Sequence, residues 1–229
     1  MNCPIYDSNE MIVFGMDSNL IDAETIDEFA RAAGIMGKVE EITKREICRD
    51  LDFEQTLAEW GRIIRELSLE TIPYAVHKIN IIPVATEHIL HFKSRGYKDT
   101  MISGGFTISA TEVCKALNNN FVVTNELLVE DSYIKGKVVG SVTQSNPRGA
   151  FEELTLFSRI RPERGVVVEE SANNTHLFER AVFAVAFNPK YINKGVCGCG
   201  HCRKDLKAII PVLKSLSYQF CNQAQNVDI

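Results

Sequence analysis

The sequence predicts an α/β fold in which a mostly parallel sheet carries helices on both faces and the first strand is followed by a helical insertion. Three observations carry this prediction. An apolar run near the N-terminus ends in Gly15, a purely helical pattern fills residues 38–79, and short apolar runs alternate with helical patterns after Pro83. Such alternation is typical of parallel sheets covered on both faces.

The first strand is predicted at residues 11–16, whose continuous apolar character is typical of a strand buried in a parallel sheet. Asp22 stands where an N-cap belongs, before a helix expected from Ala23 to Ala33. Gly34 is placed to end that helix, because glycine adopts the left-handed C-terminal conformation at low cost. The chain therefore runs from a strand through a polar turn into a helix.

The insertion is predicted because apolar residues stay at helical spacing from residue 38 to residue 79, with no alternating run. Charged residues fill the gaps, so the apolar faces of these helices must pack on one another. We therefore expect residues 23–80 to form a helical-bundle cap. Residues 1–22 and 81–229 are expected to form one discontinuous core domain.

The remaining elements follow from the changes of period after Pro83. We expect helices at 85–94, 107–117, 150–158 and 175–181, and strands at 97–102, 121–129, 133–142, 165–168 and 182–187. Ligands of parallel sheets bind beyond the carboxyl ends of the strands. Three such ends therefore stand out, at residues 15–19, 103–105 and 169–174.

Composition narrows the classes of partner. The net charge is −5 and no basic stripe appears, which argues against nucleic acid as a partner. No apolar run approaches the roughly 20 residues that span a bilayer, and the N-terminus lacks a secretory signal pattern. The seven cysteines suit a reducing compartment. We expect a cytoplasmic protein with no membrane partner, whose partner is a small anionic ligand or a protein; a homodimer stays open.

Polar residues at the first strand ends suggest phosphoryl chemistry, which needs an acid, anion-binding donors and balancing positive charge. Asp17 could serve as the acid, or it could only hold the turn. The hydroxyl of Ser103 and the backbone N–H groups of Gly104 and Gly105 could cradle an anion, or could form a tight turn. Arg148, just before a predicted helix, is a cation that would reach the same cleft.

The nucleophile is missing from this set. A carboxylate at Glu169 or Glu170 could hold Mg²⁺, or could belong to a solvated rim. The position from which a side chain would attack is occupied by Gly15, which has no side chain. The arrangement therefore suggests binding without the usual covalent step.

A cysteine-rich loop near the C-terminus offers a second chemistry. Its C-x-C-x-x-C spacing on a glycine-rich segment provides soft ligands for Zn²⁺ or an iron–sulfur cluster, and these ligands are Cys197, Cys199, His201 and Cys202. Unliganded thiols are the other interpretation of the same cluster.

Four motifs in order resemble those of phosphoserine phosphatases of the haloacid dehalogenase (HAD) superfamily. They are IVFGMDSNLIDAETIDEFARAAG, ISGGF, SNPRGAFEEL and VVVEESANNTHLF, within a resemblance that runs from Ile12 to Leu213. The resemblance implies a HAD-like Rossmannoid core with a cap inserted after the first strand. Asp17, Ser18, Ser103, Gly104 and Gly105 match the family pattern, and Glu24 aligns with the glutamate that receives the substrate ammonium.

The departures from the family pattern lie at the positions that carry the family's chemistry. Gly15 stands at the aspartyl nucleophile, which is also a metal ligand, and Arg148 replaces a lysine. Glu170 and Asn174 stand where the family has two metal-associated aspartates, which implies a weakened Mg²⁺ site. Trp60 aligns with the arginine that binds the substrate carboxylate.

These observations predict a phosphoserine phosphatase-like protein that has lost its nucleophile and acts by non-hydrolytic binding, in regulation or in cofactor assembly. One alternative is a Mg²⁺-dependent phosphomonoester hydrolase or phosphotransferase with a rearranged active site. The other is a metal or iron–sulfur carrier that works through the cysteine loop.

Overall fold

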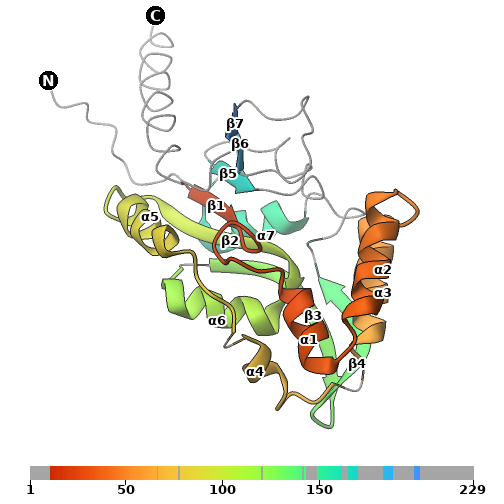
Figure 1. Cartoon of the computed structure of the whole chain (residues 1–229). Coiled ribbons are helices and arrows are strands. Elements are labelled where there is room, and N and C mark those ends of the chain that lie inside the picture. The colour runs from red at the N-terminus through yellow and green to blue at the C-terminus, as the bar shows by residue number, and fades with distance from the viewer. Residues whose placement is uncertain are drawn as a thin grey trace, which may run out of the picture.

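The sheet lies at the centre of the molecule, with β1 between β2 and β5 (Figure 1). The structure is a computed structural model and describes residues 11–65, 67–76, 78–119, 121–140, 142, 149–160, 165–169, 183–187 and 199–201. Within these residues the sheet has seven strands in the order β4-β3-β2-β1-β5-β6-β7. They are β1 (Met11–Gly15), β2 (Lys98–Phe106), β3 (Phe121–Glu130), β4 (Tyr133–Gly140), β5 (Gly165–Glu169), β6 (Phe183–Phe187) and β7 (Cys199–His201).

The sheet is mostly parallel, as the sequence predicts. Only β3 and β4 pair in antiparallel fashion, and the other neighbouring strands of the described sheet are parallel. This hairpin turns through Asp131 and Ser132, whose φ values of 51° and 64° are those that tight two-residue hairpin turns favour. The parallel arrangement brings the carboxyl ends of β1, β2 and β5 to one edge, because all three strands run the same way.

Side chains of β1 alternate between the two faces of the sheet, and each face is covered by helices. Ile12 and Phe14 pack with α5 and α6, whereas Met11 and Val13 pack with α7. These helices are α5 (Pro83–Lys93), α6 (Thr107–Leu117) and α7 (Gly149–Ser158). The α/β layering with helices on both faces, predicted from the alternation of elements, is confirmed.

The segment after β1 is helical, as predicted, and lies to one side of the sheet (Figure 1). Its α3 begins with a capping box, in which the Asp52 carboxylate accepts the Gln55 N–H and the Gln55 side chain accepts the Asp52 N–H. The helices of this segment are α1 (Thr25–Ala33), α2 (Met36–Ile47), α3 (Phe53–Ile63) and α4 (Ile72–Val76). None of the described helices combines the length and apolar character needed to cross a bilayer.

The sequence did not predict that the β3–β4 hairpin packs against this helical segment. Leu127 and Ile134 belong to the same apolar cluster as α1 and α3. Backbone hydrogen bonds also join the two regions, from the Ile134 N–H to the Leu67 carbonyl (3.1 Å) and from the Leu69 N–H to the Ser132 carbonyl (3.0 Å). The helices therefore pack on a hairpin as well as on one another, which helical periodicity alone does not reveal.

Two predicted boundaries next to the site residues were wrong. Helix α1 begins at Thr25 and not at Ala23, and Glu24 rather than Asp22 occupies the N-cap. Strand β2 does not end at residue 102, because it continues to Phe106 with a shift of register against β3. Both errors lie beside the polar turn, where side chains compete with the regular backbone pattern.

Candidate functional site

The carboxyl ends of β1 and β2 meet at one carboxyl group, that of Asp17. Gly15, the last residue of β1, is buried and pairs with Ile102 of β2. Two residues later, the partly buried Asp17 accepts a hydrogen bond from the Thr25 N–H (3.0 Å to Oδ1) and a longer one from the Ser103 hydroxyl (3.4 Å to Oδ2). The turn after β1, the start of α1 and the end of β2 thus converge on one side chain.

Ser103 links the glycine pair of β2 to this carboxyl group. Its side chain is buried, and its Oγ accepts the Gly105 N–H at 3.0 Å while its hydroxyl donates to Asp17. A Cβ at Gly105 would lie 3.1 Å from both Ser103 Oγ and Thr25 Oγ1, which leaves little room for any other residue. Of the N–H groups expected to cradle an anion, that of Gly105 is therefore already paired within the site.

The polar turn after β1 is held by its own side chains. Ser18 has a φ of 56°, a left-handed conformation that costs a non-glycine residue about 1 kcal/mol. Its hydroxyl donates to Glu24 Oε1 at 3.1 Å, and the buried Asn19 amide donates to the Asp17 carbonyl oxygen at 3.3 Å. Strain of this kind gathers at binding sites, where the surrounding contacts offset it.

The electrostatic environment makes Asp17 unusual. Its burial, followed by the negative charge of Glu24, raises the pKa of the Asp17 carboxyl from 3.8 to about 7. The hydrogen bonds from Thr25 and Ser103 act in the opposite direction and offset part of that rise. Asp17 can therefore hold or release a proton near neutrality, which suits a group that assists an anion or a leaving oxygen.

The glycine pair is fixed from two further sides. Phe53, the first residue of α3, packs on Gly104 so closely that a Cβ there would lie 2.5 Å from the ring Cζ. On the other side, the Asn125 amide donates to the carbonyl oxygens of Gly104 (3.0 Å) and Val142 (3.1 Å), and its Oδ1 accepts the Val142 N–H (3.2 Å). Asn125 thereby joins the end of β2 to the backbone of Val142.

Sequence reasoning missed Thr25, Phe53 and Asn125. A polar Asn125 inside the apolar run of residues 121–129 was a usable signal, since a buried amide must find partners. Thr25 was missed because the predicted helix began at Ala23, whereas Thr25 is the first residue of α1. Nothing in the sequence marks Phe53, because its contact with Gly104 joins segments that lie about 50 residues apart.

The structure brings together one part of the predicted site. The residues that meet around the ends of β1 and β2 are Asp17, Ser18, Glu24, Ser103, Gly104 and Gly105. Trp60 packs against the apolar cluster of the helical segment. Five predicted residues lie outside the described part of the chain, namely Arg148, Glu170, Asn174, Cys197 and Cys202.

The cysteine loop is described only in part. The backbone of Cys199–His201 forms β7, which pairs with β6 at the edge of the described sheet opposite β4. Among the residues that the structure describes, no group of three or more His, Cys, Asp or Glu side chains is arranged to hold a metal ion. The Zn²⁺ or iron–sulfur site at Cys197, Cys199, His201 and Cys202 stays a prediction.

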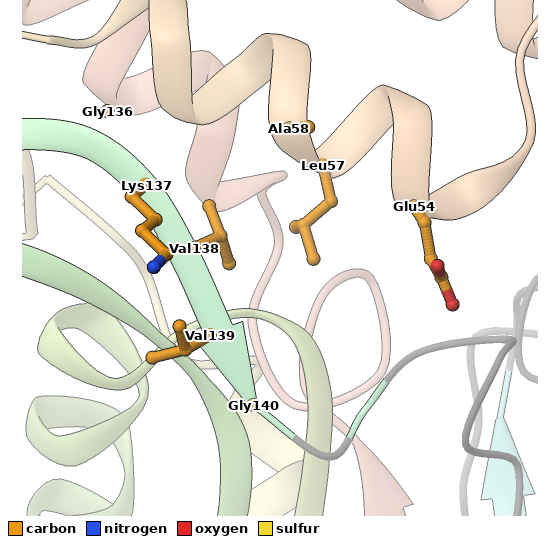
Figure 2. A pocket seen from close by; sticks show the side chains of 8 residues that line it. All are labelled: Glu54, Leu57, Ala58, Gly136, Lys137, Val138, Val139 and Gly140. Atoms are coloured by element: carbon orange, nitrogen blue, oxygen red, sulfur yellow. The ribbon is translucent and has the colours of Figure 1, made fainter.

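A cavity of about 370 Å³ lies between α3 and β4, away from the predicted site residues. Figure 2 shows Leu57 pointing from α3 toward the strand, with Glu54 and Lys137 set well apart along its rim. The residues that meet around Asp17 at the ends of β1 and β2 do not line this cavity.

Comparison with known proteins identifies relatives over most of the chain. The sequence is 33% identical over 206 residues to a phosphoserine phosphatase of Methanocaldococcus jannaschii, an alignment that covers 90% of this chain and 98% of that protein. It is 34% identical over 184 residues to a phosphoserine phosphatase of Idiomarina loihiensis, covering 80% and 84% of the two chains. No family model matches the sequence.

Solved structures agree with these sequence relatives. A phosphoserine phosphatase described as a phospho-aspartyl intermediate analogue superposes with a TM-score of 0.81 at 32% identity, covering 89% of this chain and 98% of the other. A HAD family hydrolase of Salmonella enterica serovar Typhi superposes with a TM-score of 0.78 at 20% identity, covering 85% of this chain and 68% of the other, which supports the fold alone.

Proposed function

We propose that this chain, which belongs to the phosphoserine phosphatase-like branch of the HAD superfamily, binds a small anionic ligand, of which a phosphate group is the simplest example, without hydrolysing it through an aspartyl phosphate. The ligand would lie at the carboxyl ends of β1 and β2, against Ser103 and Asp17. A binding role of this kind suits a regulatory or cofactor-assembly protein.

One observation carries the proposal, which is that the last residue of β1 is Gly15. A related phosphoserine phosphatase is described with a phospho-aspartyl intermediate analogue, and this chain matches its family over most of its length. Such an intermediate needs a carboxylate that attacks the phosphorus atom. In this chain the resemblance aligns that carboxylate with Gly15, which has no side chain, while Asp17 and Ser103 keep their hydrogen bonds beside it.

The test is phosphate release from phosphoserine and from p-nitrophenyl phosphate in the presence of Mg²⁺. We expect the unmodified chain to release no phosphate above the uncatalysed background. Gly15→Asp restores the missing carboxylate and is expected to raise turnover, because losing a nucleophile typically costs several orders of magnitude in rate. Gly15→Asn is the matched control, since it has nearly the same size but no carboxylate.

A second function is favoured by the raised pKa of Asp17, which is about 7. A group that titrates near neutrality is suited to general acid or base catalysis. The chain would then be a phosphomonoester hydrolase or phosphotransferase in which Glu169 or Glu170 and a metal-bound water replace the nucleophile. Metal-dependent turnover by the unmodified chain that disappears in Asp17→Asn would establish this function and remove the first.

A further inference from the structure

The geometry points to an anion site that works without a divalent cation, an inference that rests on the proposed function and specifies the charge balance of the same site. The family resemblance implies Mg²⁺ held by the nucleophilic aspartate and by carboxylates at positions 170 and 174. Of these three positions, the structure describes only Gly15, at the end of β1.

Magnesium binds oxygen atoms that point lone pairs toward it at about 2.0 to 2.1 Å, usually with one or two carboxylates among them. Gly15 supplies no side-chain oxygen. The oxygens of Asp17 already accept hydrogen bonds, Oδ1 from the Thr25 N–H, Oδ2 from the Ser103 hydroxyl and the carbonyl oxygen from the Asn19 amide. The described end of β1 therefore provides no carboxylate at the position that the resemblance assigns to the metal, and its one remaining carboxylate, Asp17, is held by donors of the protein, so the described residues at this strand end do not fit a Mg²⁺ site.

The negative charge at the end of β1 is also lower than the family pattern implies. Wherever several carboxylates surround a phosphate, a cation is needed to offset their repulsion. At the described end of β1, Gly15 leaves one carboxylate fewer than the family pattern has. An anion approaching Ser103 therefore meets less negative charge, and the requirement for a cation falls with it.

Calorimetric titration of the full chain with inorganic phosphate, once with EDTA and once with millimolar Mg²⁺, tests this inference. We expect the two dissociation constants to agree within about twofold. Phosphate that binds about tenfold tighter or more with Mg²⁺ would overturn the inference and leave the proposed function standing. Phosphate that binds in neither buffer would overturn both.

Two variants sharpen the titration. Gly15→Asp adds a carboxylate at the end of β1, beside the proposed anion site, so we expect the affinity of this variant for phosphate to fall by about tenfold or more in EDTA and to recover with Mg²⁺. Gly15→Asn, of nearly the same size and without charge, should bind equally in the two buffers. Equal loss of affinity in both variants would mean that size and not charge governs the site.

Metal binding can also be measured directly on the unmodified chain, which does not depend on whether the position 15 variants fold. Mn²⁺ is a paramagnetic substitute for Mg²⁺, and its electron paramagnetic resonance signal weakens when a protein binds it. With the unmodified chain and phosphate, we expect the signal of micromolar Mn²⁺ to stay unchanged. Stoichiometric loss of the signal that depends on phosphate would contradict a metal-independent site.

Discussion

The ends of β1 and β2 lie side by side, and they differ in what they keep. The end of β2 carries Ser103, Gly104 and Gly105, which are held by Asn125 on one side and by Asp17 on the other. The end of β1 keeps Asp17 but ends in Gly15, where the resemblance implies a nucleophile. The end of β2 therefore carries hydrogen bonds on both sides, whereas β1 ends in a residue that has no side chain.

The hydrogen bonds around Asp17 do not depend on the side chain at position 15. The hydrogen bonds that hold Asp17 come from Thr25, Ser103 and Asn19, and none of them uses residue 15. Removing the side chain at position 15 leaves all of these bonds in place. The proposed function therefore requires no change in the hydrogen bonds that hold Asp17.

The largest effect is expected at the end of β1, from the titration of Asp17. Because folding raises the pKa of this carboxyl from 3.8 to about 7, the folded state holds the proton more tightly than the unfolded state. The free energy of unfolding should therefore fall as pH rises from about 4 to about 7 and then level off. We expect this group to contribute a loss of about 2 to 3 kcal/mol between pH 5 and pH 8.

Urea denaturation at pH 5 and pH 8 measures this loss, with Asp17→Asn as the matched variant because it cannot titrate. The difference in stability between the unmodified chain and the variant should change with pH in favour of the unmodified chain at pH 5. If that difference is the same at both pH values, the Asp17 carboxyl does not titrate near neutrality.

A somewhat smaller effect is expected at the end of β2, from Gly104→Ala. The added methyl group would lie 2.5 Å from the Phe53 ring, so the start of α3 must shift. Overpacking of this kind costs about 2 kcal/mol, measurable as a lower free energy of unfolding in urea. Gly37→Ala is the control, since a Cβ there meets nothing within 4 Å, and in helix α2 it should leave stability unchanged or slightly raised. An undiminished stability of Gly104→Ala would mean that Phe53 does not rest on this strand end.

The smallest effect is expected from Ser103→Ala, which removes the hydroxyl between Gly105 and Asp17. We expect the affinity for inorganic phosphate to fall about tenfold, close to the value of one hydrogen bond to a charged group. Ser109→Ala is the matched control, because Ser109 in α6 is also buried and its hydroxyl donates to the carbonyl oxygen of Phe106, the last residue of β2 (2.9 Å). Equal affinities of the two variants for phosphate would exclude Ser103 from the binding site.

The fold was predictable because its signals are local and repeated. Gly15 at the end of an apolar run, the change of period at Pro83 and the alternating elements after it all follow from 2.0- and 3.6-residue periodicities. The wrong boundaries at Ala23 and at residue 102 lie where side chains compete with the backbone for hydrogen bonds. Periodicity carries no information about such exchanges.

The site was predictable only where its residues lie at the ends of strands. Asp17 and Ser103 come directly after or within strands, so their meeting follows from strand order. The roles of Phe53 and Asn125 depend on how distant segments pack, and the pKa of Asp17 depends on its burial beside Glu24. These are tertiary properties, which no spacing in the sequence encodes.

One measurement tests the central claim most directly, which is that this chain binds a phosphate group without cleaving the ester. Phosphorus NMR of p-nitrophenyl phosphate mixed with the full chain and Mg²⁺ reports binding and cleavage in the same sample. We predict that the ester resonance shifts or broadens with added protein and that no inorganic phosphate accumulates over hours. Steady growth of the inorganic phosphate resonance, absent from a sample without protein, would contradict the account.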